Sequence, residues 1–282
     1  MATPDRLLLS DAKPDPGPST DVLAFFALTF LPTAPMWALS ALTPVQFMPE
    51  LPFSAVAVVC PAAAALILTT RRRGAKAALA LLKRAVDVRR IRLKRGWAPL
   101  ILIMPVCGVA TFMASRLSGS DIPDPQFSAV TAVALFLLFL VSAMAEELGW
   151  SGFAIGPLQA RWGALPAALA LGGVWAIWHY PALLQAQHPV AWIGWWTLGA
   201  VTMRVVMVWL FNNTGHSVFG AAVFHAISNL CWQLYPVHGS DFSPCLNGLA
   251  LAAVALAAVW GWGPNTLSSW GWRAPAGRAA GG

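Results

Sequence analysis

Two adjacent glutamates, Glu146 and Glu147, lie in a part of the chain that carries almost no charge. Between residues 126 and 235 the only other charged side chains are Arg161 and Arg204. The same stretch holds four of the five histidines, and carboxylates with imidazoles are the groups that most often transfer protons in enzymes. An ionisable group inside a bilayer costs at least about 2.5–3.5 kcal/mol, so its presence there indicates a functional site.

Spacing along the chain indicates which groups could meet the glutamates. Glu146 lies 16 residues before Trp162, and His179 lies 17 residues after it. If the chain turns near Trp162, both groups lie roughly 20–25 Å along an antiparallel helix pair, because a helix rises 1.5 Å per residue. His225 and Asn229 are four residues apart, which places them on one helix face. We therefore expect a cluster of a carboxylate, two imidazoles and an amide.

The elements that must position this cluster are membrane helices. The chain has 282 residues, of which 58% are hydrophobic and 10% are charged, and its mean hydropathy is +0.65. A soluble domain carries roughly 25% charged residues, so the composition excludes an ordinary soluble enzyme, a disordered chain and a typical DNA-binding domain. The predicted fold is an all-α polytopic transmembrane bundle, because about 20 mostly apolar residues span a bilayer. Eight stretches qualify: 22–40, 51–70, 97–115, 127–156, 164–184, 192–211, 217–235 and 245–262.

The orientation and domain limits follow from charge. Of the 18 lysines and arginines, 11 lie between residues 71 and 95, which the positive-inside rule assigns to a cytoplasmic loop rather than to nucleic-acid binding. Both termini are then cytoplasmic. We expect a disordered tail over 1–21, a single integral membrane domain over 22–262 with its catalytic core at about 126–235, and a flexible tail over 263–282. The site is expected to act near the cytoplasmic side.

Three short motifs carry a family resemblance. They are Glu146-Glu147-Leu148-Gly149-Trp150-Ser151, Trp175-Ala176-Ile177-Trp178-His179 and His225-Ala226-Ile227-Ser228-Asn229. In this order and spacing, over about residues 126–235, the chain resembles the CAAX-protease and bacteriocin-processing (CPBP or Abi) family of intramembrane endopeptidases. The family's first motif ends in an arginine where this chain has Ser151. We expect Arg204 to supply the missing positive charge.

The resemblance implies a peptide hydrolase with a role for each residue. Glu146 would activate a water that attacks a peptide bond of a membrane-associated or lipidated protein. His179 would hold the water or stabilise developing charge. His225 and Asn229 would donate hydrogen bonds to the oxyanion of the tetrahedral intermediate. Glu147 points about 100° away from Glu146 on a helix, so it is expected to position its helix or to tune Glu146.

Several alternatives stay open. Glu146, His179 and His225 could bind zinc, since three protein ligands suffice for a catalytic zinc site; the preferred mechanism needs no cofactor. Intramembrane glutamates and histidines also occur in proton-coupled transporters. Loss of the family arginine at Ser151 would fit a catalytically impaired immunity or scaffold protein. The expected partners are a peptide or lipidated protein and membrane lipids, in a bacterial-type plasma membrane.

The other conspicuous aromatic and imidazole side chains are assigned structural positions. We expect solvated or helix-capping positions for the remaining histidines, His188, His216 and His238. Tryptophans are enriched where a membrane meets water, so an interfacial belt is expected for Trp192, Trp195 and Trp196.

Overall fold

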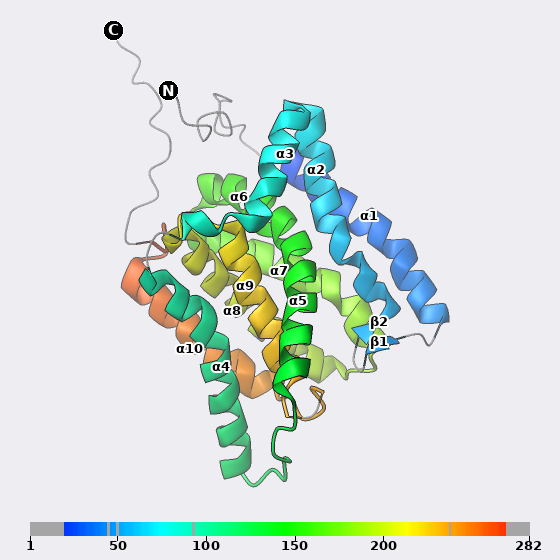
Figure 1. Cartoon of the computed structure of the whole chain (residues 1–282), viewed down its shortest axis with the longest axis vertical. Helices are drawn as coiled ribbons and strands as arrows, with labels where there is room; N and C mark the ends of the chain where they lie inside the picture. The colour runs from blue at the N-terminus through cyan, green and yellow to red at the C-terminus, as the bar shows by residue number, and fades with distance from the viewer. Residues whose placement is uncertain (1–19, 44–45, 49–50, 92–93, 237, 269–282) are drawn as a thin grey trace.

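The fold is a bundle of long, mostly apolar helices (Figure 1). It comes from a computed structural model that describes residues 20–43, 46–48, 51–91, 94–236 and 238–268. In chain order the elements are α1 (Thr20–Leu42), β1 (Gln46–Met48), β2 (Leu51–Pro52), η2 (Phe53–Val58), α2 (Val59–Arg73), α3 (Ala75–Lys83), η3 (Arg84–Val86), η4 (Val88–Arg90), α4 (Lys94–Leu117), α5 (Ala129–Gly149), η5 (Trp150–Ala154), α6 (Ile155–Trp162), α7 (Ala164–Gln185), α8 (Val190–Asn213), α9 (Val218–Gln233) and α10 (Pro244–Trp262).

The predicted all-α membrane bundle is confirmed. Among the described residues, seven helices are long and apolar enough to cross a membrane, and they coincide with seven of the eight predicted spans. The remaining predicted span, 217–235, is α9, which has 16 residues and is therefore roughly 24 Å long. Helix α9 packs against α4, α5 and α8, and Figure 1 shows it near the middle of the bundle. The only strands in the described ranges are β1 and β2, which form a short antiparallel pair.

Local sequence sets where the helices around the site begin. The side chain of Ser128 accepts a hydrogen bond from the backbone amide of Thr131 at the start of α5. Ser217 does the same for Gly220 at the start of α9. Serine at this position satisfies one of the four backbone N–H groups that a helix start leaves without a partner. These caps fix the two helices that bring Glu146 and His225 together.

One end of the bundle carries the basic segment and is called the basic end below. The guanidinium of Arg84 donates to the carbonyl oxygens of Gly152 and His216, at 3.1 and 2.8 Å. A carboxylate oxygen of Asp87 accepts from the hydroxyl of Ser217 at 2.7 Å. These bonds attach η3 and the loop before η4 to η5 and to the α8–α9 turn, so the basic segment and both of those elements share one end.

His216 lies in that α8–α9 turn and is partly buried. Its backbone has φ +57°, a conformation that favours glycine and asparagine over other residues. Burial lowers the pKa of His216 below its usual value of 6.5, and the guanidiniums of Arg84 and Arg90 lower it further. The residue is thus part of a packed turn, in contrast to the solvated or capping position expected from the sequence.

The described residues after α10 pack against the basic end. The side-chain amide of Asn212 donates to the carbonyl oxygen of Thr266 at 2.8 Å, and Leu267 is fully buried. The flexible tail predicted over 263–282 therefore differs from the structure at 263–268. Residues 269–282, and 1–19 of the predicted N-terminal tail, lie outside the described residues.

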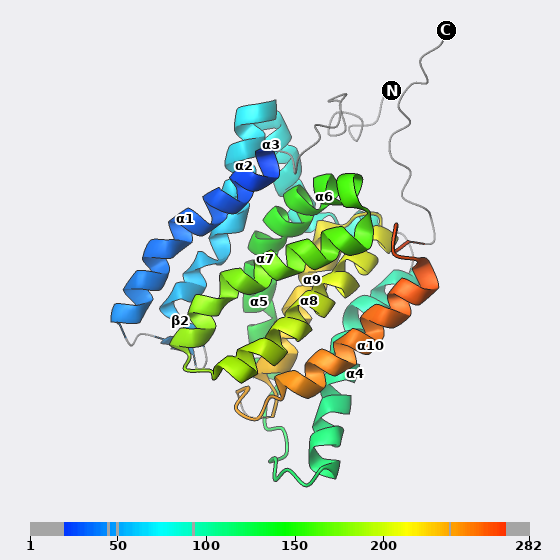
Figure 2. The ribbon, with the colours of Figure 1, turned by 180° about the vertical axis from the view of Figure 1, so that it is seen from behind.

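The other end of the bundle, called the opposite end, carries the loops that alternate with those of the basic end. It contains the β1–β2 pair, the loop after α4, the α7–α8 loop and the loop before α10 (Figures 1 and 2). The side chain of Gln185, at the end of α7, donates to the carbonyl of Trp37 at 2.7 Å and accepts from Ser54 at 2.9 Å. These bonds connect α7 to α1 and η2 at the opposite end.

Candidate active site

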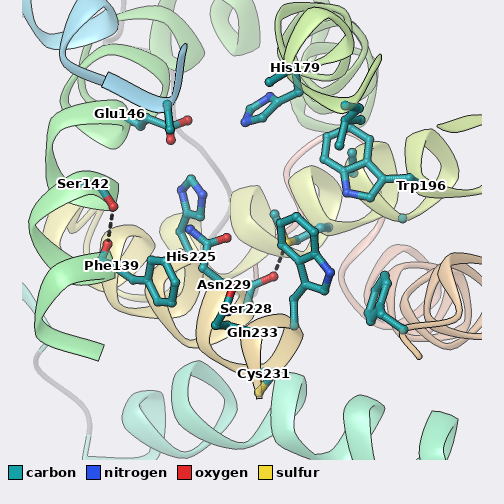
Figure 3. A pocket seen from close by; sticks show the side chains of 18 of the residues that line it. Phe139, Ser142, Glu146, His179, Trp196, His225, Ser228, Asn229, Cys231 and Gln233 are labelled. Carbon is teal, nitrogen blue, oxygen red and sulfur yellow. Dashed lines mark hydrogen bonds between the residues drawn. The ribbon is translucent and has the colours of Figure 1, made fainter. Parts of the chain in front are cut away.

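One cavity of about 550 Å³ is lined by four of the residues that the sequence singled out. Glu146 comes from α5, His179 from α7, and His225 with Asn229 from α9. Figure 3 shows the side chains of Glu146, His179 and His225 directed toward a shared space. Three helices that are separate in sequence therefore place a carboxylate, two imidazoles and an amide around one volume.

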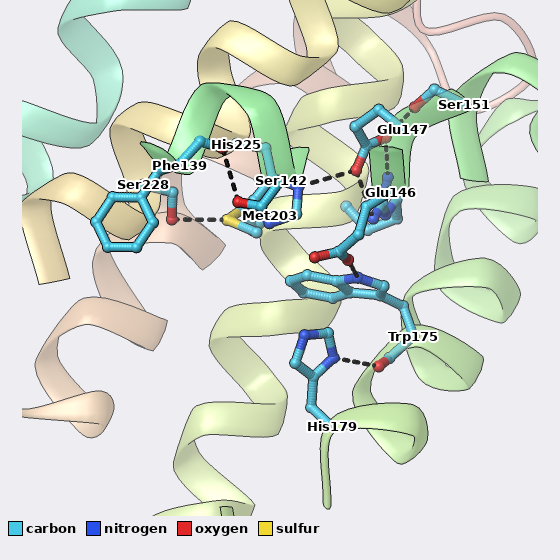
Figure 4. Close-up of polar contacts among 11 residues, drawn as sticks. Phe139, Ser142, Glu146, Glu147, Ser151, Trp175, His179, Met203, His225 and Ser228 are labelled. Carbon is cyan, nitrogen blue, oxygen red and sulfur yellow. Dashed lines mark hydrogen bonds and ion pairs between the residues drawn. The ribbon is translucent and has the colours of Figure 1, made fainter. Parts of the chain in front are cut away.

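Glu146 is almost completely buried, with 3% of its surface exposed. One carboxylate oxygen accepts a hydrogen bond from the indole Nε1–H of Trp175, at 2.9 Å. Trp175 lies on α7 one turn before His179, so the same helix supplies both groups. This hydrogen bond, drawn in Figure 4, holds the carboxylate of Glu146 in place at the cavity wall.

The ring of His179 is held by its own helix. Its Nδ1 lies 2.8 Å from the carbonyl oxygen of Trp175, and because a carbonyl only accepts, Nδ1 carries the hydrogen. In the neutral imidazole the lone pair is then on Nε2. Trp178 packs edge-on against the ring with centroids 4.8 Å apart, and Trp196 lies at 5.4 Å. The aromatic side chains restrict His179 to one orientation in the cavity wall.

Glu147 points away from the cavity and is paired on every side. The two outer nitrogens of Arg204 donate to its two oxygens, at 2.8 and 3.2 Å. Nδ1 of His225 lies 3.1 Å from one of these oxygens, and the hydroxyl of Ser151 donates to the other. Figure 4 shows His225 and Ser151 in contact with this carboxylate. Glu147 is thus held by protein groups and does not line the cavity.

Arg204 therefore contacts Glu147, as the missing family arginine led us to expect. It is fully buried on α8, and its guanidinium carbon lies 5.0 Å from the centroid of the Trp175 ring. Gly172 of α7 allows this approach, because a Cβ there would lie 3.0 Å from Cβ of Arg204 and 3.1 Å from Cα of Val201. The serine at position 151 and the arginine at position 204 together hold Glu147.

A turn of π-helix, η5, begins three residues after Glu147. Such turns are rare and frequent at functional sites. The backbone amide of Trp150, at its start, donates to the carbonyl oxygens of Glu146 and Glu147. The indole of Trp150 is fully buried, with its ring 5.2 Å from that of Phe25 and 6.0 Å from that of Trp178. This packing fills the bundle on the basic side of the glutamates.

The cavity extends from the glutamates toward the opposite end. Its lining comes from η2, residues 104–111 of α4, residues 138–146 of α5, the second halves of α7 and α9, residues 196–203 of α8 and the first turns of α10. His179 is six residues before the end of α7 at Gln185, which is roughly 9 Å at 1.5 Å per residue. The structure does not fit the expectation that the site opens on the side of the basic segment, because the layer of Glu147 and Trp150 closes that side.

Two tryptophans that contact the site, Trp175 and Trp196, are not identified as site residues by the sequence. Trp175 was visible only as the aromatic residue one turn before His179, and its hydrogen bond to Glu146 depends on how α5 meets α7. Trp196 was assigned to an interfacial belt, but it lines the cavity and stacks on Trp175 with centroids 6.0 Å apart. A stripe of tryptophans at a helix end does not distinguish a lipid contact from a cavity wall.

The arrangement does not form a ready-made metal site. Within the described ranges, no three His, Cys, Asp or Glu side chains are grouped so that they could hold a metal ion. His179 and His225 each use Nδ1 for a contact inside the protein, and one oxygen of Glu146 accepts from Trp175. Histidines that bind zinc commonly donate their other ring N–H to a carbonyl or a carboxylate, so these three contacts do not decide whether the site takes a metal.

Comparison with known proteins covers the same part of the chain. Residues 128–231 match the family model described as type II CAAX prenyl endopeptidase Rce1-like. Over 151 residues, or 49% of the chain, it is 28% identical to CAAX prenyl protease 2 of Methanococcus maripaludis, of which the match covers 56%. The chain therefore spans little more than half the length of this relative. The family resemblance indicated by the three motifs is confirmed, and the matched segment contains all of the site residues from Glu146 to Asn229.

Proposed function

We propose that this integral membrane protein is a CAAX-type intramembrane endopeptidase that hydrolyses a peptide bond with a water activated by Glu146. The observation that carries the proposal is the convergence of Glu146, His179, His225 and Asn229 on one cavity. The family match and the name of the archaeal relative support peptide hydrolysis. The substrate is a membrane-associated or lipidated protein or peptide, because the site lies within the membrane-spanning helices.

The reaction begins with a proton transfer. Glu146 takes a proton from a water molecule, and the oxygen of that water forms a bond to the carbonyl carbon of the peptide. His179, whose lone pair is on Nε2, accepts a hydrogen bond from the water and orients it. When the carbon–nitrogen bond breaks, Glu146 returns the proton to the leaving amine. General acid–base catalysis of this kind contributes about 10²–10⁴-fold in rate.

The oxyanion of the tetrahedral intermediate is stabilised from α9. Asn229 donates from its amide, and His225 donates from Nε2. Since Nδ1 of His225 already donates to Glu147, a second donation requires the imidazolium form. The charges of Glu146, Glu147, Arg204 and His225 then sum to zero, which suits a buried site because an unpaired buried charge is strongly unfavourable. Glu147 and Arg204 thus position His225 without touching the substrate.

The test is cleavage of a quenched peptide library by the purified full-length chain in detergent, with products identified by mass spectrometry. Glu146→Gln keeps the hydrogen bond acceptor for Trp175 but cannot take a proton, so we expect activity to fall by about 10²–10⁴-fold. The matched control is Asp124→Asn, a carboxylate that is 81% exposed and paired with Arg116; it should cleave like the parent. Proton-driven flux into liposomes without any cleavage would favour a transporter instead.

Metal dependence is tested separately on the same preparation. We propose a metal-independent route, because the carboxylate of Glu146 at the cavity can itself take the proton from water. Activity should survive dialysis against a chelator. Loss of activity that added zinc restores would overturn this route and leave the peptidase assignment intact.

A further inference from the structure

We propose that Gln233 and Asn247 bind the main chain of the substrate, so that the peptide lies extended along α9 with its scissile carbonyl at Asn229. The inference rests on the proposed peptidase function and adds the way in which that site holds a peptide. Neither residue takes part in the proton transfer or in the oxyanion contacts. Three observations carry it: the hydrogen bonding of the cavity wall, the spacing of the amides, and the chemistry of a carboxamide.

The first observation concerns the polar side chains of the cavity wall. Every serine and threonine hydroxyl of the lining has a hydrogen bond within the protein, and these hydroxyls belong to Ser54, Thr111, Ser142 and Ser228. The carboxamides of the lining are those of Asn229, Gln233 and Asn247. Within the described part of the chain, none of these three side-chain amides has a hydrogen-bond partner.

Burial makes this lack of partners informative. Gln233 and Asn247 are only 7% and 9% exposed, and a buried amide without a hydrogen bond is unfavourable. Elsewhere the fold satisfies such groups: the amides of Gln159 and Asn212, which do not line the cavity, pair with each other at 2.7 and 3.3 Å. The cavity amides are therefore available to a ligand that occupies the cavity.

The second observation is the spacing along α9. Gln233 follows Asn229 by four residues, as Asn229 follows His225. Residues four apart share a helix face, and Figure 3 shows these side chains in succession along α9. One such step is roughly 6 Å along the helix axis. In an extended peptide every second carbonyl points the same way, roughly 6.4–6.8 Å from the first. A peptide whose scissile carbonyl contacts Asn229 therefore brings the carbonyl two residues further along to Gln233.

The third observation is the match between a carboxamide and a peptide group. A carboxamide has two N–H donors and an oxygen that accepts, and a peptide group offers one acceptor and one donor. Gln233 is the last residue of α9, and Asn247 is the fourth residue of α10, the next helix. Amides from two helices thus meet the same outer part of the cavity. Because they bind main-chain groups, this contact does not depend on the side chains of the substrate.

The test first alters the peptide groups of the substrate. The substrate is the quenched peptide that the purified full-length chain cleaves fastest, and each peptide bond except the scissile one is replaced singly by an ester. An ester lacks the N–H and accepts a hydrogen bond more weakly. We expect the ester two residues from the scissile bond, on one side of it, to raise KM by about 2–10-fold, the effect of one neutral hydrogen bond. The change in kcat should be small, because the contact is made before and during the reaction.

The variants Gln233→Met and Asn247→Leu then remove the amides with little change in side-chain size. Each should raise KM for the parent peptide, and Gln233→Met should cleave the sensitive ester as well as it cleaves the peptide. The Tm in detergent should stay the same or rise, because no hydrogen bond within the described protein is lost. The matched control is Gln126→Met, an exposed residue outside the cavity, which should keep the sensitivity to the ester.

Three outcomes would contradict the inference. Equal KM values of the parent chain for the peptide and all of its esters would overturn it and leave the peptidase function standing. A lower Tm of Gln233→Met with an unchanged response to the ester would assign the residue a structural role instead. Absence of cleavage of any peptide by the parent chain would overturn the peptidase function and the inference with it.

Discussion

Replacing Arg204 by methionine removes the cation from the buried pair with Glu147 and keeps a long apolar side chain. The two side chains are 1% and 0% exposed, so solvent does not screen the pair and the small energies of surface ion pairs do not apply. Breaking a buried ion pair by removing one partner costs about 3–5 kcal/mol, because the other charge is left uncompensated. We expect a loss of this size in the free energy of unfolding for Arg204→Met, and a similar loss for Glu147→Gln.

The double variant Glu147→Gln/Arg204→Met separates pairing from packing. It leaves neither charge of the pair buried, so its cost should be smaller than the sum of the two single costs, by about 3 kcal/mol on the same reasoning. Unfolding is followed in mixed detergent micelles by titration with a denaturing detergent. Independent sites add within about 0.3–0.5 kcal/mol. Additivity within that range would refute the view that Arg204 serves as the counter-ion of Glu147.

The same carboxylate allows a test of the residue that departs from the family pattern. Ser151 is one helical turn from Glu147 and is 6% exposed. In the Arg204→Met background, Ser151→Arg returns a guanidinium next to Glu147 and should recover part of the lost stability and activity. In the parent the same change adds a second cation to a carboxylate that is already paired, and should destabilise. Effects of the same sign in both backgrounds would contradict this explanation of position 151.

Three further predictions concern packing, catalysis and pH. Gly172→Ala should lower the free energy of unfolding by about 1–3 kcal/mol, because a Cβ there would lie 3.1 Å from the backbone of the next helix. The matched control is Gly173→Ala, where a Cβ would have no other atom within 4 Å, and it should be neutral in the same unfolding assay. Trp175→Phe keeps the ring and removes the donor to Glu146, so peptide cleavage assays should show a reduced kcat with a smaller change in KM. Because burial and two guanidiniums lower the pKa of His216, the unfolded chain binds more protons than the folded one just below pH 6.5, and stability should fall as the pH falls through that value. Asparagine tolerates the positive φ, so the His216→Asn variant should show a smaller fall of Tm in detergent between about pH 7.5 and 5.5 than the parent chain. An equal fall in the two proteins would contradict the view that His216 causes this pH dependence.

Much of the fold could be predicted from the sequence because membrane helices need long apolar runs, and the runs in this chain are separated by prolines, glycines and charges. The site residues could be found for the same reason. In a stretch with so few charges, Glu146 stood out, and equal distances from the turn at Trp162 placed His179 level with it. The seventh predicted span proved to be α9, which is too short to be identified as a span by length. Its position among α4, α5 and α8 is a property of packing.

The sequence by itself determined that this is a membrane bundle, which residues are candidates for chemistry, and which end is rich in basic residues. Only the tertiary structure decided how Glu146 and Glu147 divide their roles. Neighbours on a helix point about 100° apart, and α7 happens to present Trp175 to one of them while α8 presents Arg204 to the other. The direction of the cavity was likewise decided by packing, because helical periodicity specifies which face a residue occupies but not which half of the bundle is filled. Trp150 and the paired Glu147 fill the basic half, so the reacting groups open toward the opposite end.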